Sequence, residues 1–451
     1  MHVILDVSRL LLSVRRAAPS GIDRVEMAYA TRWLSRPPGH CTFVAQALTG
    51  GFAAVPRPAV AALLEAIEAG WEGVPGAQRQ AWNAALPILA GLGLGAGKRA
   101  LRDALAASGR AGRRSVFLLV SHRALDRAAA IAPLRRAGAA FVPFVHDLIP
   151  LSHPEYARPP QVRRHAARVA TVSAMADGVV VNSAATAASL RTELAARGLP
   201  APAAVAVAPL GLQARRRIEP STSPLPRECS TTELQQRPAG PHPAAAAPPA
   251  AAPYFVCLGT IEPRKNHLLL LHLWRDLAAR SGDAAPRLLL IGRRGWENEN
   301  ILDLLDRCAA LRGLVRECGA PGDAEVASLL AGSRALLFPS FAEGYGLPLA
   351  EALALGVPAL CSDLPALREV GGAVPDYLDP LDGAAWRRAV LDYAGPASAA
   401  RAAQLARLSA WRPPDWDAHF ATVDALLERV ASGRAEARAP ASLPALEEVP
   451  A

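Results

Sequence analysis

Residues 339–351 hold two glutamates, Glu343 and Glu351, on either side of a glycine-containing turn, and read PSFAEGYGLPLAE. The apolar run before them, 335–338, has the length of a buried strand. Glu343 would then lie in the loop at the strand's carboxyl end, and Glu351 about two helical turns further along the chain. Carboxylates accept several hydrogen bonds from sugar hydroxyls, glycines let the backbone approach a ligand, and a helix amino end offers N–H groups to an anion. One loop could thus hold a sugar, a diphosphate and a ribose. The alternative, two ordinary glutamates on a solvated helix face, does not explain the glycines, Pro348 and the preceding strand.

A second polar stretch, residues 259–266, follows another apolar run and reads GTIEPRKN. Lys265 could reach a phosphate oxygen with a compact charge, and Arg264 could add a planar fork of donors. A basic first turn before a surface helix is the alternative, but the macrodipole disfavours cations near a helix amino end. Lysine is also scarce, because only Lys98 and Lys265 occur among 49 basic residues. A lysine at this position therefore indicates a bound anion.

Two further candidates follow apolar runs in the first half of the chain. His146 opens the stretch HDLIP, and Ser183 follows the run 178–181. A lone histidine after a strand is often structural, but the carboxyl ends of parallel strands are where α/β proteins bind ligands. Ser183 could bond a sugar or phosphate, or could cap the next helix. We assign His146 to the site and leave both readings of Ser183 open.

Other motifs do not indicate a metal site or a phosphate loop. The stretch Asp415-Trp416-Asp417 resembles a metal-binding Asp-x-Asp, but it follows two prolines and opens a helix, so capping explains it better. Residues 91–98 read GLGLGAGK, but Arg99 stands where a phosphate loop needs Ser or Thr. No His, Cys or Asp cluster has metal-ligand spacing, so we expect no metal and no cofactor besides a substrate.

The elements that must position these residues alternate between strands and helices. In the first half, a glycine-containing turn at 20–23 opens a helix that runs through Ala30, and 56–112 reads as a helical insertion. The other elements predicted in this half are strands at 2–7, 117–120, 141–145 and 178–181 and a helix at 162–176. In the second half, the predicted strands are 254–258, 287–291, 314–317, 335–338 and 357–362, and the helices 267–279, 301–311, 325–330, 347–355 and 415–430. This alternation predicts an α/β fold with parallel sheets covered by helices.

The composition divides the chain into four parts. Residues 1–213 form a predicted amino-terminal Rossmann-like domain, and 214–252 a Pro/Ala-rich linker without periodicity. Residues 253–431 form a second such domain with a closing helix, and 432–451 a loose tail. We expect two doubly wound domains that face one another across a cleft, with the ligand between them.

Bulk properties suggest a cytoplasmic enzyme. The 451 residues suit two domains, the six cysteines form no Cys-x-x-Cys pair, and we read neither a spanning helix nor a secretory signal. The net charge of +9 favours anionic partners. In the insertion, the apolar stretch 84–97 precedes several basic residues. This stretch has two equally favoured interpretations. It could make peripheral contact with the inner membrane, or it could pack on its own domain.

The combined motifs resemble the retaining glycosyltransferases of family 4, which have the GT-B architecture, and especially bacterial polysaccharide mannosyltransferases. The resemblance rests on the motifs above and on Gly21, the pair Gly295-Trp296, and the run from Val357-Pro358 to Arg368-Glu369-Val370. It departs from the family where Thr260 replaces an arginine that many relatives carry. Which arginine, Arg264 or Arg293, assists Lys265 therefore stays open.

The resemblance implies roles for individual residues. The catalytic set would be Glu343 on the donor sugar, Lys265 on the diphosphate and His146 near the transferred sugar. Glu351 would bind the ribose. The remaining donor-binding residues implied are Arg264, Gly344, Tyr345, Gly346, Leu347, Ser183 and Gly21.

The activity implied is transfer of a hexose, with retention, from a nucleotide sugar to a saccharide or polyprenyl-linked acceptor in polysaccharide biosynthesis. GDP-mannose is the first choice of donor, with UDP-sugars next, and no nucleic acid partner is expected. A nucleotide-sugar epimerase of the same architecture and a non-catalytic nucleotide-sugar-binding subunit are the alternatives.

Overall fold

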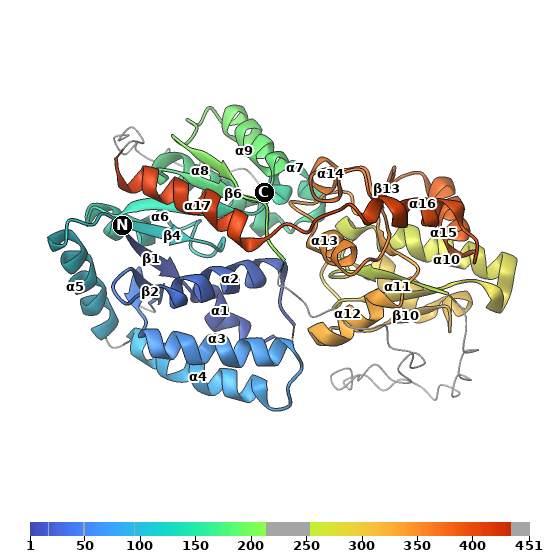
Figure 1. The fold of residues 1–451 in the computed structure, drawn as a ribbon, viewed down its shortest axis with the longest axis horizontal. Helices are drawn as coiled ribbons and strands as arrows, with labels where there is room; N and C mark the ends of the chain where they lie inside the picture. Colours follow the sequence, from blue (N-terminus) through green and yellow to red (C-terminus); the bar gives the residue numbers. More distant parts are fainter. Residues whose placement is uncertain (17, 48–49, 94, 213–252, 434–451) are drawn as a thin grey trace. The chain divides into compact units, whose positions relative to one another are not determined.

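The computed structural model describes residues 1–16, 18–47, 50–93, 95–212 and 253–433, which form two compact units (Figure 1). The first unit comprises Met1–Gly211 together with the chain from Asp415 onward, and the second comprises Leu212–Pro414. Each unit contains one β-sheet with its own helices.

The first unit is built on a seven-stranded sheet in the order β3-β2-β1-β4-β5-β6-β7. Its neighbouring strands are parallel except β3, which is antiparallel to β2. Every residue of the central strands β1, β4 and β5 is buried, as expected where helices cover both faces of a parallel sheet. The strands are β1 His2–Asp6, β2 Cys41–Gln46, β3 Phe52–Ala54, β4 Ser115–Leu119, β5 Ala140–Val145, β6 Val179–Val181 and β7 Val205–Val207.

Along the chain, the helices of the first unit lie between its strands, except α17, which comes after the second unit. They are α1 Ser8–Ser13, α2 Gly21–Ser35, α3 Arg57–Trp71, α4 Ala77–Gly93, α5 Ala96–Arg110, α6 Ala128–Arg136, α7 Ile149–Ser152, α8 Pro159–Met175, α9 Ala184–Ala196 and α17 Trp416–Ala431. The insertion predicted at 56–112 is the group α3, α4 and α5, between β3 and β4. Its apolar side faces its own unit, because Ala85, Ile88 and Leu92 of α4 are buried. Packing on its own domain is thus the reading of stretch 84–97 that the structure favours.

Helix α17 belongs to the first unit, whereas the sequence analysis placed it at the end of the second domain. Its residue His419 bonds the Tyr29 hydroxyl at 2.8 Å, and Phe420 packs edge-on to Tyr29 at 5.0 Å between ring centroids. Arg32 and Asp424 add an ion pair. The apolar face of this helix predicts that it packs against a core, but does not show which one. Its place in the first unit follows from these contacts between residues far apart in the sequence.

The second unit is a six-stranded, fully parallel sheet in the order β10-β9-β8-β11-β12-β13. Its strands are β8 Tyr254–Leu258, β9 Arg287–Ile291, β10 Val315–Glu317, β11 Leu336–Phe338, β12 Ala359–Ser362 and β13 Asp376–Leu378. Its helices are α10 His267–Ser281, α11 Glu299–Arg307, α12 Asp323–Ala331, α13 Leu347–Ala354, α14 Pro365–Gly371, α15 Gly383–Ala394 and α16 Ala399–Leu408. The apolar core of this unit includes Trp274 and Trp386, both fully buried.

The order of the strands brings the two predicted ligand loops together. Strand β8 lies between β9 and β11, and its Val256 pairs with Leu336 of β11. The loops after β8 and β11 therefore leave the same edge of the sheet as neighbours, which parallel strands require. The predicted linker 214–252 and most of the predicted tail, 434–451, lie outside the described residues.

Candidate functional site

The loop after β8 leaves the sheet in close contact with the loop after β9. A Cβ added to Gly292 would lie 1.9 Å from the carbonyl oxygen of Gly259, so only glycine permits this approach. Gly292 also has φ +151°. The loop after β8 continues as a short parallel bridge between Ile261 and Arg294.

The 3₁₀ turn Pro263–Lys265 (η2) then carries the basic residues of the site. Asn266 ends this turn in the left-handed conformation, at φ 55°, and its side chain donates to the carbonyl of Pro380 at 3.0 Å. The backbone N–H of Phe341 donates to the carbonyl of Arg264 at 2.9 Å. The turn is thus held on both sides, and Lys265 is 8% exposed.

Lys265, Arg264 and Glu343 form an ion-pair cluster between the loops after β8 and β11. Lys265 Nζ lies 2.5 Å from Glu343 Oε1, and Arg264 Nη1 lies 3.1 Å from Glu343 Oε2. Arg264 Nη2 also lies 2.7 Å from Glu262 Oε1. The Lys265 ammonium is 4.6 Å from the ring centroid of Phe338, which ends β11. The cluster combines a buried ammonium and a half-buried guanidinium with a carboxylate that both of them contact.

The charges of this cluster control its protonation. Burial acts to raise the pKa of Glu343, but the charges of Lys265 and Arg264 and the hydrogen bond from Lys265 outweigh it and lower the pKa to about 2. Burial lowers the pKa of Lys265, and the Glu343 carboxylate opposes that effect. Glu343 is therefore ionised at neutral pH.

We expect the ion pair to stabilise the fold in a defined acid range. The pKa of Glu343 falls from 4.5 to about 2 on folding, so the carboxylate contributes about 3 kcal/mol above pH 4.5, which is lost as the pH falls toward 2. The variant Glu343→Gln should be less stable than the wild type at pH 5, and the difference should narrow at pH 3. Urea unfolding at both pH values measures it. A difference that does not change with pH would show that Glu343 has an ordinary pKa.

The turn into α13 places the second glutamate. Gly346, at φ +103°, precedes α13, and an added Cβ there would lie 2.5 Å from Leu367 Cδ2, so a side chain is excluded. Tyr345 beside it is 6% exposed. Leu347 begins α13, whose first turn presents backbone N–H groups at an amino end. Glu351 lies on α13 and is half-buried. The donor-binding residues predicted between positions 343 and 351 thus lie on one continuous segment, which consists of a loop and the first turns of α13.

In the first unit, His146 follows β5 and is held as a neutral imidazole. Burial lowers the pKa of His146 to about 4. Its Nε2 lies 2.7 Å from the carbonyl oxygen of Val120, so this nitrogen carries the proton and donates it. The ring stacks on Phe144 at 4.2 Å between centroids. His146 can thus offer a fixed, uncharged ring to a ligand, with Nδ1 as the nitrogen that holds a lone pair.

Ser183 and Gly21 both lie at helix starts in the first unit. The Ser183 hydroxyl accepts the backbone N–H of Thr186 at 3.0 Å and caps α9, which is the alternative that the sequence analysis left open. Gly21 is the exposed first residue of α2, after the cap Ser20. The side chains of Ser20 and Asp23 bond one another's backbone N–H groups in a capping box.

A buried acidic pair near β1 was not predicted from the sequence. Asp6 ends β1 and Glu26 lies on α2, and both are almost fully buried. Burial raises the pKa of Asp6 to about 7, against the hydrogen bonds from Ser8, and burial together with the charge of Asp6 raises the pKa of Glu26. The sequence signal for this pair was Asp6 at the end of the first apolar run. An acidic residue at a strand end is common, so it does not indicate a buried pair unless its partner is known.

The two motifs set aside in the sequence have structural explanations. Asp415 accepts the backbone N–H of Ala418 at 2.7 Å and caps α17, as predicted. Residues 91–93 end α4 and residues 96–98 begin α5, and no strand directly precedes them, so this stretch is not a phosphate loop. Within the described ranges, no group of three or more His, Cys, Asp or Glu side chains is arranged to hold a metal ion. Nor does any helix of those ranges have the length and hydropathy needed to cross a membrane.

Part of the second unit is similar to known proteins. Residues 252–394 match the family model described as "Glycosyl transferases group 1". The O-antigen chain mannosyltransferase B of Escherichia coli is 39% identical over 129 residues, which are 29% of this chain and 33% of the relative. The aligned segment thus spans a third of that relative.

Solved structures resemble most of the chain in fold. Anabaena HepE in complex with UDP and glucose superposes with a TM-score of 0.59 at 14% identity, covering 95% of this chain and all (100%) of the other. Sucrose-phosphate synthase from Thermosynechococcus elongatus gives a TM-score of 0.58 at 16% identity, covering 96% and 100%. These similarities confirm the predicted fold class, two Rossmann-like halves of the GT-B type.

Proposed function

We propose that this chain, whose residues 252–394 carry a glycosyltransferase group 1 domain, transfers a hexose from a nucleotide sugar to a saccharide or lipid-linked saccharide acceptor. The observation that carries the proposal is the cluster of Lys265, Arg264 and Glu343 at the carboxyl ends of β8 and β11. Ligands of open α/β sheets bind at that edge.

The cluster has the chemistry that departure of a nucleoside diphosphate requires. Cleaving the bond between sugar and phosphate leaves negative charge on the diphosphate. A preorganised ammonium and guanidinium in a buried site stabilise that charge without waiting for solvent to reorganise. The N–H groups at the start of α13 add partial positive charge beside the same loop. Lys265 and Arg264 therefore bind the leaving group in this proposal, and the structure favours Arg264 over Arg293 because Arg264 contacts Glu343 directly.

The two glutamates take different parts of the donor. Glu343 is ionised and oriented by two cations, so it can accept hydrogen bonds from the hydroxyls of the transferred sugar. Glu351 is the fifth residue of α13, about one turn into the helix, where it can accept bonds from the ribose. We further propose that the anomeric configuration is retained, with the leaving phosphate accepting the acceptor's proton on the same face of the sugar.

Mannose is the hexose we propose. The support is the 39% identity over 129 residues between this chain and a segment of an O-antigen mannosyltransferase. A UDP-linked hexose is the second choice, because a structure of similar fold contains UDP and glucose. We place the reaction in the synthesis of a surface polysaccharide in the cytoplasm.

A thermal-shift screen over nucleotide sugars tests the donor. A donor at about 100 times its dissociation constant adds roughly 2.7 kcal/mol of stability, which raises the melting temperature by several degrees. We expect GDP-mannose to do this, free mannose to have no such effect, and Lys265→Ala to reduce the shift. If no GDP- or UDP-sugar and neither free nucleotide shifts the melting temperature of the wild type, the proposed function is wrong.

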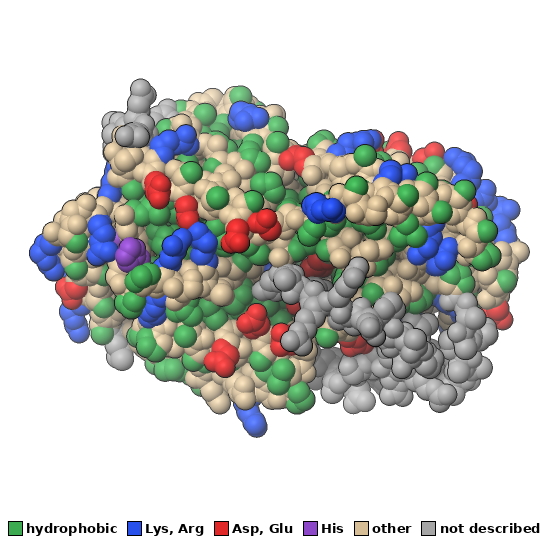
Figure 2. Space-filling view, viewed as in Figure 1, with side chains coloured by type: hydrophobic (Ala, Val, Ile, Leu, Met, Phe, Trp, Pro, Cys, Tyr) green, Lys and Arg blue, Asp and Glu red, His purple; other side chains and the backbone are tan. Residues whose placement is uncertain are grey.

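We also propose that the basic face of α5 contacts an anionic membrane surface where a lipid-linked acceptor resides. Basic side chains gather over α5, at the left of the view in Figure 2. They include the exposed residues Arg99, Arg102 and Arg110, whereas most of the apolar side chains of the insertion face inward. The contact is therefore electrostatic, at about 1 kcal/mol for each basic residue near the surface.

Liposome sedimentation measures this contact. We expect the protein to sediment with vesicles that contain phosphatidylglycerol at low salt and to be released by higher salt. The triple variant Arg99→Gln, Arg102→Gln, Arg110→Gln should stay in the supernatant, and the exposed Arg312→Gln in the second unit serves as the control. If the wild type does not sediment with these vesicles at low salt, the membrane contact is wrong.

A further inference from the structure

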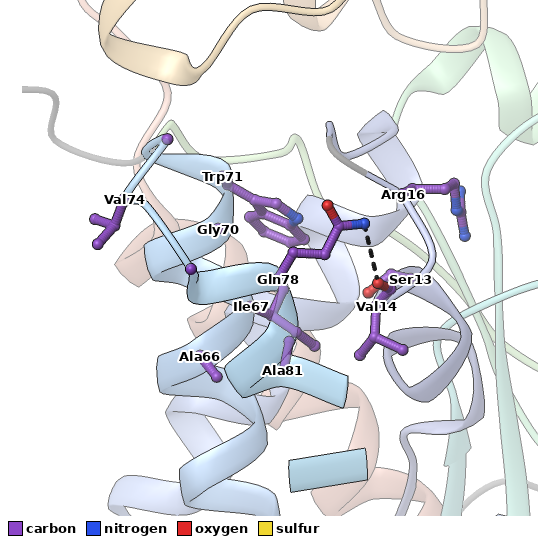
Figure 3. Close-up of a pocket in the computed structure, with 12 residues that line it drawn as sticks. Ser13, Val14, Arg16, Ala66, Ile67, Gly70, Trp71, Val74, Gln78 and Ala81 are labelled. Atoms are coloured by element: carbon purple, nitrogen blue, oxygen red, sulfur yellow. Dashed lines mark hydrogen bonds between the residues drawn. The ribbon is translucent and has the colours of Figure 1, made fainter. Parts of the chain in front are cut away.

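The first unit has a cavity of about 210 Å³ where the helical insertion meets the chain after α1 (Figure 3). Its polar groups already have partners within the unit. Gln78 donates one N–H to the Val14 carbonyl at 3.5 Å, and Arg16 is paired with Asp23 at 3.0 Å. Two side chains at the carboxyl ends of β4 and β6, by contrast, bond His146 and do not line this cavity.

The backbone of His146 is held by these side chains from both neighbouring strands. Its N–H donates to Nε2 of His122 at 3.0 Å, and its carbonyl accepts an amide N–H of Asn182 at 2.9 Å. His122 lies three residues after β4, and Asn182 directly follows β6. In a regular parallel sheet, bonds in these directions join backbone groups. Side chains replace the ladder at the end of β5, so the place of His146 depends on which residues supply them.

The ring of His146 is held as well, and one of its nitrogens remains for a ligand. Nε2 donates to the Val120 carbonyl at 2.7 Å, and the ring stacks on Phe144. Nδ1 bonds no group among the residues that the structure describes, and 4% of His146 is exposed. In this tautomer Nδ1 holds a lone pair, so it can accept a hydrogen bond from a hydroxyl group but cannot donate one.

His122 can accept the backbone N–H only as a neutral imidazole with its proton on Nδ1, because a protonated Nε2 would have no lone pair. Burial lowers the pKa of His122 well below its ordinary value, and the charges of His146 and Arg168 act in the same direction. The ring of His165 packs edge-on against His122 at 5.4 Å between centroids and limits its rotation. The acceptor for the His146 N–H is therefore preformed.

We propose that His122 is a positioning residue for sugar transfer, which holds the backbone of His146 so that Nδ1 of His146 can accept a hydrogen bond from a sugar hydroxyl. The part that His146 plays in transfer rests on the proposed function, whereas its bond to His122 is a property of the first unit alone. His122 acts through His146 and need not touch the sugar. A misplacement of about 1 Å can lower a rate about a hundredfold, so a residue that fixes the backbone can affect turnover.

Two substitutions separate the acceptor of His122 from its packing. His122→Phe keeps a ring of similar size but leaves the buried N–H of His146 without a partner. His122→Gln keeps an acceptor, because its amide oxygen can lie near the position of Nε2. The matched control is His153→Phe, since His153 is a half-buried histidine of the first unit that bonds Ser152 and not His146.

Steady-state kinetics and melting temperatures are measured for each variant of the full chain. We expect His122→Phe to lower kcat about tenfold, with little change in nucleotide affinity, because the groups proposed to bind the diphosphate and ribose lie in the second unit. His122→Gln should stay close to the wild-type rate, and so should His153→Phe. A loss of packing alone would instead affect His122→Gln as much as His122→Phe.

A double-mutant cycle shows whether His122 acts through His146. It compares kcat for the wild type, His122→Phe, His146→Phe and the double variant. We expect the double variant to be as slow as His146→Phe, because without the imidazole there is no Nδ1 left to position. If the two losses multiply in the double variant, His122 acts independently of His146 and the positioning role is wrong.

NMR of the ring nitrogens tests the same assignment without sugar transfer. In the full chain with ¹⁵N-labelled histidine at pH 7, we expect His146 to carry its proton on Nε2 and His122 to carry its proton on Nδ1. The variants at the two positions assign the signals. The signals of His146 should change in His122→Phe and should match the wild type in His122→Gln and His153→Phe.

The outcomes keep this inference apart from the proposed function. If the wild type transfers sugar and a folded His122→Phe variant does so at the same rate, the positioning role is wrong and the proposed function stands. If even the wild type transfers no sugar, the proposed function fails, and the ring-nitrogen signals decide whether His122 fixes His146. Should His122→Phe not fold, the wild-type spectrum decides, because a proton on Nε2 of His122 would rule out its bond to the His146 N–H.

Discussion

Replacing Lys265 with alanine is expected to lower the rate of sugar transfer about a hundredfold or more. That is the usual cost of removing one preorganised donor to developing negative charge. Lys265→Arg should also be impaired, because a planar fork does not occupy the position of a compact ammonium 2.5 Å from Glu343. Steady-state kinetics with saturating donor measure both variants.

The chain contains a matched control for this substitution. Lys98 is the other lysine of the sequence and lies on α5, so Lys98→Ala removes the same group away from the ion-pair cluster. It should transfer sugar at the wild-type rate. Lys265→Ala leaves the buried Glu343 with Arg264 alone, so its melting temperature must be measured beside its rate. Full activity in a folded Lys265→Ala variant would remove Lys265 from the diphosphate site.

The glutamates on either side of the α13 turn should separate turnover from nucleotide binding. We expect Glu343→Gln to lower kcat about a hundredfold with little change in nucleotide affinity, because the carboxylate acts on the transferred sugar. Glu351→Gln should weaken nucleotide binding about tenfold, the cost of one hydrogen bond to a charged group. Titration with nucleoside diphosphate and single-turnover kinetics distinguish the two effects.

Glu299 supplies the control for this pair, since it is an exposed glutamate in the first turn of α11. Glu299→Gln should change neither quantity. If Glu343→Gln weakens nucleotide binding and Glu351→Gln slows transfer instead, the two roles are exchanged and the proposed placement of the donor is wrong.

The second unit shows how far local sequence patterns can lead. Its ligand loops follow strands β8 and β11, and both strands were predicted from apolar runs within one residue of their observed bounds. The carboxyl-end rule for parallel strands then placed Lys265 and Glu343 at one edge. Their direct contact was not predictable, because it depends on β8 and β11 being neighbours in the sheet, which the spacing of the strands along the chain does not specify.

Other features depend on contacts that no local pattern contains. The strands β2, β3, β7 and β13 were not predicted, and the last three have only three residues each, which are too few to show a period. The acidic pair of Asp6 and Glu26 is defined by shared burial, and helix α17 is defined by the core against which it packs. Each needed the tertiary structure, because burial and long-range pairing are properties of the folded chain.

The most direct test of the central claim is to follow one reaction by NMR. The full chain is mixed with GDP-mannose and a saccharide acceptor that ends in mannose, in the presence of EDTA. We predict that the donor signals decay as GDP and a new glycoside appear in equal amounts, with the donor's anomeric configuration in the initial product. Chelation should not matter, because Lys265, Arg264 and the start of α13 supply the positive charge for the leaving group. An unchanged donor that needs added magnesium or manganese to react, or an inverted anomeric centre, would contradict this account.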